Sequence, residues 1–510
     1  MKIIKIILIM LLIFEFFCHL ISANQDVEIH GFLSQGFLKT DQDNYFADTE
    51  SGSFEFNEFG INLSTQLNDQ FITGLQLVSR SFGDIGENKI SLDWAFADYR
   101  WKDWLGLRFG KIKTPFGLYN ETRDIDMLNT NVLLPQSIYA ESWRESLVSS
   151  TGLGLYGDLL FKFFGDIHYQ ALFGQVYIPT DGGVSKYIDR DGMMKIVDLE
   201  QPKSYNLNLI WSTPINGLKF CSSLIYSKHK MQININNHYM YGDLHLGTDI
   251  YNQIPSQIES ILENKGAGDD LTRSIFSQSI TLDHFNGIEI SDIWPKQATL
   301  IYDPLTFVVL SAEYSWNNLT LAAEHMDIRA KYEMSLNENN MFLINPSTVS
   351  NLEGYYISLD YRFTNWLKLG LYYSEYYNDK NDKKGNYHRY LNKDAAYIYS
   401  EDQRYKYALS AIGEGLKYAV KDSFGIDLSD DDLKSLNLEP KVSLIKPKYY
   451  SHNSWLKDFV ISACFDINEN WTFKLEGHFM NGSHFFNYAD DSESINQKRF
   501  MFASKLTANF

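Results

Sequence analysis

The sequence near the C-terminus alternates apolar or small residues with polar ones at a period of two. The first set is Trp471, Phe473, Leu475, Gly477 and Phe479, and the second is Thr472, Lys474, Glu476 and His478. Successive side chains of a β-strand point to opposite faces, so this run predicts a strand with one apolar and one polar face. A similar run, residues 459–467, ends only three residues earlier. Two such runs joined by a short polar turn predict a β-hairpin.

The same hairpin pattern recurs along the chain. Its short turns fall at residues 68–69, 102–103, 160–165, 214–217, 317–318, 364–365 and 468–470. Seven hairpins give fourteen strands, and Val27–Leu38 and Lys498–Phe510 add one strand at each end. Sixteen strands predict an all-β, antiparallel transmembrane barrel, because bacterial barrels have an even number of strands, short periplasmic turns and longer outer loops. A barrel of this size leaves an aqueous lumen.

The N-terminus has the features of a secretory signal. Lys2 and Lys5 precede an apolar run at 6–14, and residues 21–23 form an acceptable cleavage site. We expect residues 1–23 to be removed, and we rank an uncleaved anchor helix or a lipoprotein anchored at Cys18 lower. No later apolar run is long enough for a membrane helix. With 33 Tyr and 34 Phe, the exported chain favours an outer-membrane barrel over a large secreted β-protein.

Charge and motifs argue against several other classes. Without the three charged residues of the signal, the chain has 43 basic and 63 acidic residues, a net charge of −20. This charge argues against nucleic acid as a partner. The G-x-G-x-x-G match at Gly152–Gly157 lies inside a predicted strand with no helix after it, so it does not predict dinucleotide binding. We expect no enzymatic activity, no cofactor and no metal.

Tryptophan positions support the membrane interpretation independently. Six of the ten Trp lie beside the predicted short turns: Trp101, Trp104, Trp211, Trp316, Trp366 and Trp471. An aromatic girdle at one membrane interface predicts this clustering. A soluble β-sandwich or propeller gives no reason for it.

The most specific segment is Arg108–Asp124, with the sequence RFGKIKTPFGLYNETRD. Pro115 has no amide hydrogen and Gly117 permits a bend, so strand pairing is expected to stop there. The segment resembles Gram-negative outer-membrane porins that carry a G-K-x-K-x-P-F-G-L-Y-N-E-T-R-D run, and it is loosely similar to the phosphate-selective and general trimeric porins. The opening segment Ile29–Gly36 and the terminal Phe510 fit the same family. By motif, the resemblance covers residues 27–38 and 108–157.

The resemblance implies a third outer loop, about 115–151, that folds into the barrel and narrows the pore. Charged residues of this loop would then face charged residues of the wall. The candidate constriction residues are Arg80, Arg100, Arg108, Arg123, Asp124, Asp126, Glu141, Arg144 and Glu145. Basic and acidic groups facing each other across a constriction sort solutes by charge and dipole. The alternative is that these charges are solvated on an external loop.

Strand parity predicts further polar residues on the inner wall. The charged ones are Lys219, Arg362, Lys368, Lys474, Asp98, Asp158, Asp166, Glu313, Glu324, Asp360, Asp466 and Glu476. The two signs are roughly balanced, so the sequence shows no basic ladder for strong anion selectivity. Cys221 and Cys464 also face inward, on strands that are not adjacent, and we expect no disulfide between them.

Two connections, about 233–305 and 378–456, are far longer than ordinary loops. Both contain stretches with helical periodicity, at 254–262 and 405–420, and Ser429 with Asp432 resembles a capping box that opens a helix at Asp430. These connections are interpreted either as folded extracellular caps or as weakly ordered insertions. The resemblance to porins does not include them.

The C-terminal strand has an assembly signature. Phe502, Ser504, Leu506, Ala508 and Phe510 share one face, and the chain stops on an aromatic residue. The porin resemblance implies that the barrel-assembly machinery recognises Phe510, that the barrel contacts outer-membrane lipid and lipopolysaccharide, and that it forms a homotrimer.

The leading functional hypothesis is a porin: an integral protein of the Gram-negative outer membrane with a water-filled channel for passive diffusion of small hydrophilic solutes or ions. One alternative is a surface-binding or adhesion barrel that acts through its two long loops. Another, less favoured, is an outer-membrane lipid hydrolase, for which no convincing Ser/His/acid set is found.

Overall fold

The computed structural model describes residues 27–189, 194–235, 261, 264–265, 297–336, 348–386, 417, 421, 426–435, 450–486 and 496–510. The predicted signal, residues 1–23, lies outside the described residues, as do nearly all residues of the stretches 254–262 and 405–420. Among the described residues, no helix is both long enough and apolar enough to cross a membrane.

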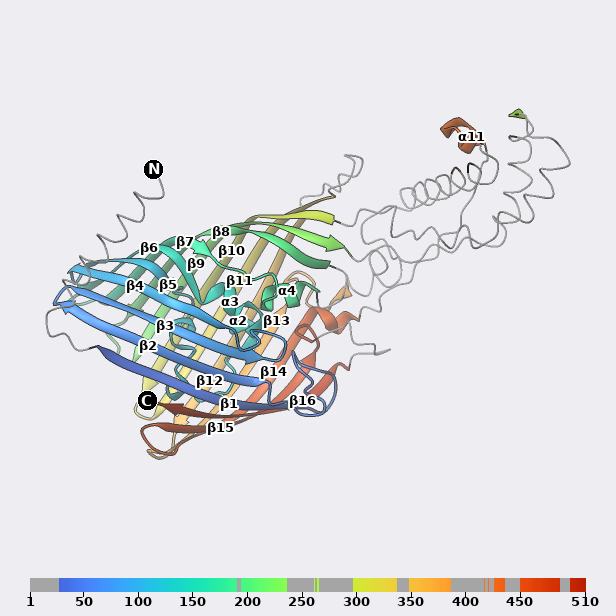
Figure 1. The fold of residues 1–510 in the computed structure, drawn as a ribbon. Helices are drawn as coiled ribbons and strands as arrows, with labels where there is room; N and C mark the ends of the chain where they lie inside the picture. The colour runs from blue at the N-terminus through green and yellow to red at the C-terminus, as the bar shows by residue number, and fades with distance from the viewer. Residues whose placement is uncertain are drawn as a thin grey trace.

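Sixteen antiparallel strands form one closed barrel, in which every strand pairs with its neighbours in sequence and the first pairs with the last (Figure 1). The strands are β1 Glu28–Thr40, β2 Phe56–Asn68, β3 Phe71–Phe82, β4 Ile90–Lys102, β5 Leu105–Lys113, β6 Ser149–Phe161, β7 Gly165–Val176, β8 Met194–Ser212, β9 Leu218–Ile235, β10 Gln297–Trp316, β11 Leu319–Leu336, β12 Thr348–Arg362, β13 Leu367–Tyr377, β14 Trp455–Asp466, β15 Trp471–Gly482 and β16 Lys498–Asn509. The predicted barrel, its strand number and all seven short-turn hairpins are confirmed.

The C-terminal residue takes part in the closure of the barrel. Phe510 and Gly31 exchange two backbone hydrogen bonds, with N···O distances of 2.8 and 3.0 Å. The Phe510 ring lies directly over Gly31, where an added Cβ would be 2.4 Å from the ring atom Cζ. Gly31 therefore leaves the space in which the terminal ring lies. Recognition of Phe510 by the assembly machinery stays a prediction.

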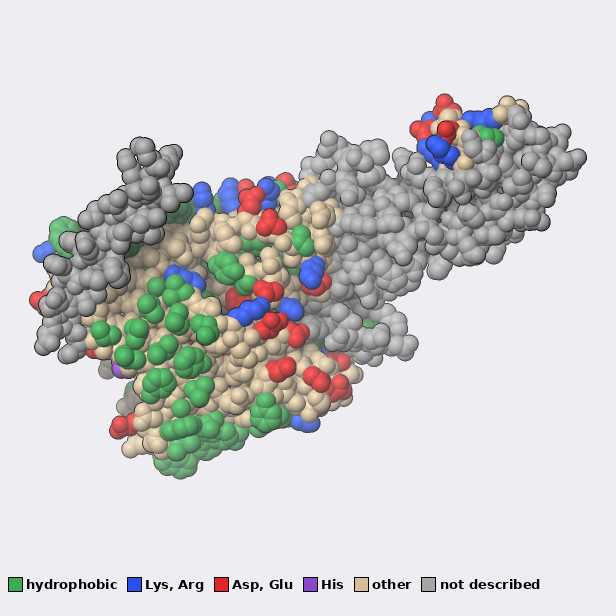
Figure 2. Space-filling model, in the orientation of Figure 1, with side chains coloured by type: hydrophobic (Ala, Val, Ile, Leu, Met, Phe, Trp, Pro, Cys, Tyr) green, Lys and Arg blue, Asp and Glu red, His purple; other side chains and the backbone are tan. Residues whose placement is uncertain are grey.

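The outer surface of the barrel is apolar over the half nearest the short turns. Leu153 and Phe109 are 65% and 52% exposed on the paired strands β6 and β5, and Ile357 on β12 is 62% exposed. Figure 2 shows hydrophobic side chains gathered over this half, with charged side chains over the other half. Five of the six Trp beside the short turns are also exposed. A belt of exposed apolar residues bordered by aromatic rings is the surface that a lipid bilayer covers.

Strands β8 to β11 are longer than a bilayer requires, and their polarity reverses along their length. β10 has 20 residues, whereas about ten tilted residues cross a membrane. In the half of β11 farther from its short turn, Arg329 and Lys331 face outward, whereas Ile328 and Ala330 are buried on the inner face. Such a wall has its charged face toward water and its apolar face toward the lumen. The polar-inside alternation predicted for all strands is therefore wrong for this part.

This reversal explains why the predicted loop bounds differ from the structure. The loop predicted at 233–305 is shorter, because β9 continues to Ile235 and β10 begins at Gln297. The loop predicted at 378–456 lies between Tyr377 and Trp455, close to expectation. A search for outward apolar residues does not detect strand residues whose outward side chains are charged.

The capping box predicted at Ser429 is confirmed. The Ser429 amide donates to Asp432 Oδ2 at 2.7 Å, and the Asp432 amide donates to Ser429 Oγ at 3.2 Å. The helix that follows is α11, Asp430–Ser435. Such reciprocal bonds satisfy amide groups that a helix N-terminus otherwise leaves without partners.

A row of three glycines brings β5, β6 and β7 close together. Gly152 on β6 pairs with Gly110 on β5 and with Gly174 on β7. A Cβ at Gly152 would be 2.0 Å from the carbonyl oxygen of Phe173, whereas a Cβ at Gly154 would be no closer than 3.4 Å to any atom. The G-x-G-x-x-G match is thus part of a strand, as predicted, and its first glycine permits close backbone packing.

We predict that Gly152→Ala lowers the free energy of unfolding by about 1–3 kcal/mol, because the neighbouring backbone must move to accept the methyl group. Gly154→Ala, two residues along the same strand, serves as the matched control and should leave stability within about 0.5 kcal/mol. Urea unfolding of barrels folded into lipid vesicles measures both. Equal stability of the two variants would contradict the assigned packing.

Candidate functional site

The segment between β5 and β6, residues 114–148, folds into the barrel, and we call it the inner loop. It contains the short helices η1 Asn120–Thr122, η2 Asp126–Leu128, α2 Gln136–Tyr139, η3 Glu141–Trp143 and α3 Arg144–Leu147. Figure 1 shows α2 and α3 within the ring of strands. The loop predicted at 115–151 is therefore close to the observed segment, and the alternative of an external, solvated loop is wrong.

The inner loop is attached to β9, β11 and β12 through Gly117 near its start and through Ser137 and Tyr139 farther along. The Gly117 amide donates to Ser223 Oγ at 2.9 Å. The Tyr139 hydroxyl donates to Glu324 Oε1 at 2.5 Å, and Ser137 Oγ donates to the Tyr355 carbonyl at 3.1 Å. Ile138 and Tyr139 are almost completely buried. These contacts fix the loop against one side of the barrel.

Asp126 attaches the loop to the opposite side, where the barrel closes. Its carboxylate lies 3.2 Å from Lys474 Nζ on β15 and 2.9 Å from Lys505 Nζ on β16. It also accepts hydrogen bonds from Ser34 at 3.2 Å and Thr507 at 2.6 Å. Two cations and two hydroxyls therefore stabilise one carboxylate that is only 4% exposed.

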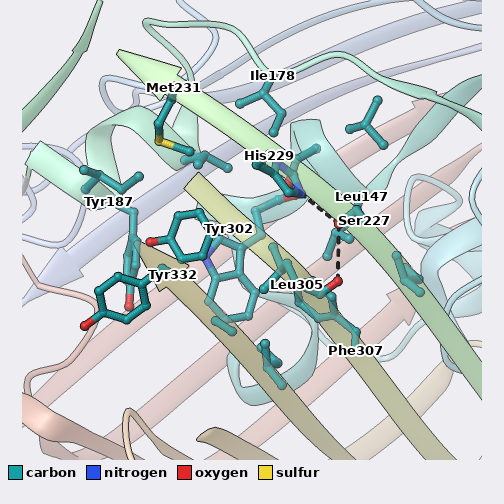
Figure 3. Close-up of a pocket in the computed structure, with 18 of the residues that line it drawn as sticks. Leu147, Ile178, Tyr187, Ser227, His229, Met231, Tyr302, Leu305, Phe307 and Tyr332 are labelled. Carbon is teal, nitrogen blue, oxygen red and sulfur yellow. Dashed lines mark hydrogen bonds between the residues drawn. The ribbon is translucent and has the colours of Figure 1, made fainter. Parts of the chain in front are cut away.

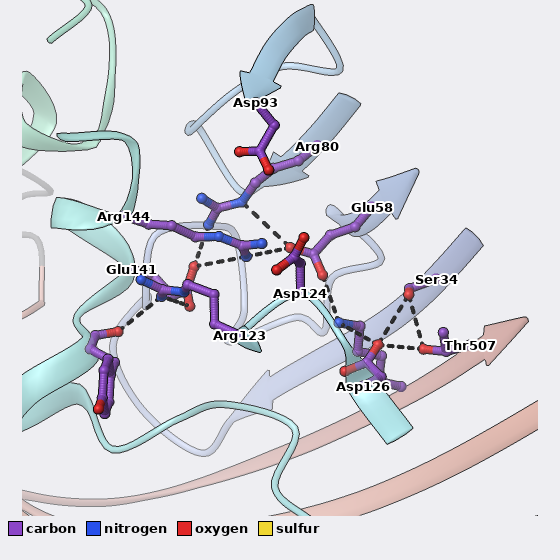
Figure 4. Close-up of polar contacts among 12 residues, drawn as sticks. Ser34, Glu58, Arg80, Asp93, Arg123, Asp124, Asp126, Glu141, Arg144 and Thr507 are labelled. Carbon is purple, nitrogen blue, oxygen red and sulfur yellow. Dashed lines mark hydrogen bonds and ion pairs between the residues drawn. The ribbon is translucent and has the colours of Figure 1, made fainter. Parts of the chain in front are cut away.

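Glu141 is at the centre of a second charged group, shown in Figure 4. One carboxylate oxygen contacts Arg80 on β3, and the other lies 2.8 Å from Arg123 Nη2. Arg144 Nη1 is 3.6 Å from Glu141 Oε2. A single carboxylate thus holds one arginine from the wall and two from the loop itself.

Glu58 on β2 links the two groups. It contacts Arg144 through Oε1, and its Oε2 accepts from Lys505 Nζ at 2.6 Å. Arg80 Nε is 3.8 Å from Glu58 Oε1. We call the connected set the charge network, and its members are Glu58, Arg80, Arg123, Asp126, Glu141, Arg144, Lys474 and Lys505. Buried charges are tolerated when they are paired and hydrogen-bonded in this way.

Five of the nine predicted constriction residues belong to the charge network: Arg80, Arg123, Asp126, Glu141 and Arg144. Asp124 lies beside it and pairs with Lys113 Nζ at 2.6 Å. Glu145 faces elsewhere, and its Oε2 accepts from the Gly183 amide at 2.8 Å. Gly183 begins the helix α4, Gly183–Asp189, which packs beside the loop.

Arg100 and Arg108 lie nearer the short turns and do not contact the charge network. Arg100 pairs with Asp158 at 3.0 Å and is 46% exposed on its side chain. Arg108 pairs with Asp98 at 2.6 Å and lies over the Phe96 ring. They are inner-wall residues, as parity predicted. Arg108 is close enough to the loop for its charge to act on Glu121, whereas Arg100 pairs with Asp103 and Asp158 beside the short turns.

Sequence reasoning missed Glu58 and Lys505 as partners of the loop. Both had a detectable signal, because their neighbours Phe59 and Leu506 belong to predicted outward faces and strand parity turns Glu58 and Lys505 inward. Which loop residues they pair with could not be predicted, because this depends on the path of the loop through the barrel. The predicted inward positions of Cys221 and Cys464 are confirmed, since both are buried and free.

The electrostatics of the loop carboxylates are dominated by their cationic partners. Burial alone would raise the pKa of Glu141, but Arg80, Arg123 and Arg144 lower it to about 2. Burial likewise opposes ionisation of Asp126, while Lys474 and Lys505 hold its pKa well below the usual range. Both groups are therefore charged at neutral pH.

Near the short turns, charged side chains line the lumen, and we call this region the vestibule. Its side chains include Arg108, Asp158, His168, Lys219 and Glu313, which are between 14% and 38% exposed. Asp158 and His168 form a hydrogen bond of 2.7 Å, and Lys219 pairs with Glu313 at 2.9 Å. Ionised groups at this exposure indicate a hydrated surface. Within the described residues, no cluster of three or more His, Cys, Asp or Glu is placed to hold a metal ion.

Between the vestibule and the outer part of the lumen runs a stripe of small polar residues. Its members are Ser150, Ser204, Asn206, Asn208 and Ser223, which we call the polar stripe; all are buried. Asn208 Nδ2 donates to Ser223 Oγ at 2.8 Å. Asn206 Nδ2 and Asn208 Oδ1 have no hydrogen-bond partner among the described residues. Buried polar atoms of this kind are usually satisfied by water.

The closed barrel, its apolar belt and its inward loop define a porin-like, integral protein of the outer membrane. No family model and no curated relative matches the sequence. Among solved structures, it is similar to outer-membrane expressed OmpT of Vibrio cholerae, with 8% identity over 96% of this chain and 99% of that one, and a TM-score of 0.45. Salmonella typhi OmpF gives 12% identity over 95% and 98%, with a TM-score of 0.45.

The outer membrane channel DcaP of Acinetobacter baumannii is also similar, with 8% identity over 96% of this chain and 98% of that one and a TM-score of 0.44. At these identities and scores, the likenesses carry no argument about function. The class therefore follows from the barrel's own geometry.

We predict that Glu141→Gln frees part of the inner loop, because Arg80, Arg123 and Arg144 lose their shared carboxylate. Removing one partner of a buried ion pair costs about 3–5 kcal/mol. Trypsin should then cleave the folded barrel at Arg123 or Arg144 faster than it cleaves the wild type. Glu145→Gln is the matched control, since its amide oxygen still accepts from Gly183. Equal protection of both variants would refute the role of Glu141.

We also predict a specific acid sensitivity. The pKa of Glu141 is depressed in the folded state, so its stabilising contribution is complete above the ordinary value of 4.5 and is lost as the pH falls toward about 2. The urea midpoint of the wild type should fall more steeply between pH 4.5 and 2 than that of Glu141→Gln. Parallel pH profiles would show that Glu141 is not held ionised by the arginines.

Proposed function

We propose that the protein is a porin: a narrow channel through which small hydrophilic solutes or ions diffuse across the outer membrane. The observation that carries this proposal is the polar stripe, in which two amide atoms have no hydrogen-bond partner within the described part of the chain. The stripe lies on β6, β8 and β9, the inner loop contacts it at Ser223, and Ser150, Ser204 and Asn206 border the outer lumen. A buried amide atom of Asn206 and one of Asn208, each without a hydrogen-bond partner among the described residues, fit a path occupied by water.

The charge network determines where the inner loop lies in the proposed channel. It fixes the inner loop on the side of β1 to β3, β15 and β16, while Gly117 and Tyr139 fix the loop on the side of β9 and β11. The loop crosses the lumen, so the remaining route for solutes follows the polar stripe. Opposite charges beside such a route favour small dipolar or ionic solutes over apolar ones.

We also propose that three barrels associate through their outer walls into a homotrimer. Heat-modifiable migration on gels tests it together with folding, since a folded trimer migrates as a larger species until it is heated. The alternative in which the long loops bind surfaces depends on residues 236–296 and 387–449, most of which lie outside the described residues.

Planar-bilayer recording tests the channel. The purified, refolded chain should insert with stable, ohmic conductance steps, and reversal potentials in a salt gradient should give its charge preference. Insertion of verified barrels without conductance would overturn the proposal.

Asn208→Trp is predicted to reduce the single-channel conductance on the order of twofold or more, because the indole would obstruct the polar stripe. Leu209→Trp is the matched control: Leu209 is the next residue on β8 and is 41% exposed on the lipid-facing side. The control should conduct like the wild type. If both variants conduct equally, the solute path does not follow the stripe.

A further inference from the structure

The outer part of the lumen contains a cavity that the polar stripe borders through Ser150, Ser204 and Asn206, and most of its lining is apolar. Its volume is about 540 Å³, within the range of small-molecule sites in proteins. It lies between the inner faces of β8 to β12, the inner loop and α4. Figure 3 shows Tyr302, Phe307 and Met231 among the side chains that surround it.

The lining of the cavity is apolar and aromatic. Tyr302 and Tyr332 contribute neighbouring rings with centroids 5.7 Å apart, and Trp143, Tyr187 and Phe307 add three more. None of the described lining residues is Asp, Glu, Lys or Arg. This composition differs sharply from the charge network and the vestibule, which lie in the same lumen. It disfavours a charged occupant, because a buried charge without a partner is costly.

The apolar lining is the inner face of the reversed wall. Ile328 and Ala330 point into the cavity from β11, whereas Arg329 and Lys331 lie on the other face of the same strand. A strand segment outside the bilayer gains nothing from an apolar lumen face if that face meets only water. The arrangement therefore favours an apolar occupant.

One end of the cavity is polar and adjoins the stripe. His229 Nε2 and Ser227 Oγ form a hydrogen bond of 2.8 Å there. Asn206 also lines the cavity, and its Nδ2 has no partner among the described residues. An occupant with one hydroxyl or carbonyl group would satisfy this amide while its apolar body contacts the rings.

We propose that this cavity is a binding site for an uncharged small organic molecule with an aromatic or compact aliphatic body and one hydrogen-bonding group. The volume sets the size, the rings and Met231 contact the body, and Asn206, Ser227 and His229 bind the polar group. The site is distinct from the charge network, and it does not depend on whether the barrel conducts ions.

Two probes that share one ring system test this site. The chain in phosphatidylcholine nanodiscs is titrated by calorimetry at pH 7 with 2-naphthol, which is uncharged, and with 2-naphthoate, which is charged; empty nanodiscs give the background. We expect 2-naphthol to bind and 2-naphthoate to bind at least about tenfold more weakly. Absence of specific 2-naphthol binding, or equal affinity for both probes, overturns the proposal.

Variants place the binding in the cavity. Ala330→Phe fills the cavity and should weaken 2-naphthol binding at least about tenfold, whereas Lys331→Phe adds the same ring to the outer face and should leave binding unchanged. If gel migration shows that Ala330→Phe does not fold, Ser350→Phe on β12 replaces it, because Ser350 lines the same cavity. Unchanged binding in a folded cavity-filling variant overturns the proposal, whatever the conductance of the channel.

Discussion

The interior of this barrel is organised by the attachment of buried carboxylates on the inner loop to cations of the wall. Asp126 is held by Lys474 and Lys505, and Glu141 is held by Arg80 together with two arginines of the loop. Removing one member would leave its partners charged and buried, which is far more costly than the pairs are stabilising. The position of the loop depends on this pairing. The loop in turn separates the charged vestibule from the outer part of the lumen.

The wall changes its chemistry along its height. Near the short turns, the outside is apolar, because it contacts lipid, and the inside has ionised groups in a hydrated vestibule. Farther out, β9 to β11 have charged outer faces and an apolar inner face that borders a cavity. One continuous sheet thus supplies four environments. The alternation of side chains along each strand makes this possible, since the two faces vary independently.

Much of the architecture was predictable from the sequence. The short turns and the outward residues such as Leu207 and Leu209 define sixteen strands, because lipid imposes a strict apolar face. Arg123, Asp126 and Glu141 were predicted as loop residues at a constriction through a motif resemblance, and the structure places them in the charge network; their role in a pore stays a proposal.

Other features were not predictable. Glu58 and Lys505 were identifiable as inward residues, but parity does not reveal which loop residue each one meets. The separation of Arg100 from the loop depends on its height in the barrel, which strand parity does not encode. The outer halves of β9 to β11 were not recognised, since Lys228 and Arg329 occupy outward positions where apolar residues were sought. Each of these unpredicted features depends on tertiary contacts or on where the membrane surface lies along the strand. The local sequence pattern encodes neither.

The charge network keeps the inner loop packed inside the barrel. Maleimide labelling of a cysteine at Ser137 tests it most directly, because Ser137 is 2% exposed and its hydroxyl contacts β12. In a chain with Cys221 and Cys464 replaced by Ser, Ser137→Cys should react slowly with a membrane-impermeant maleimide, whereas Ser51→Cys, at an exposed position, should react fast. Adding Asp126→Asn and Glu141→Gln should bring the two rates together. Fast labelling of Ser137→Cys with the charge network intact would show that the network does not hold the loop in place.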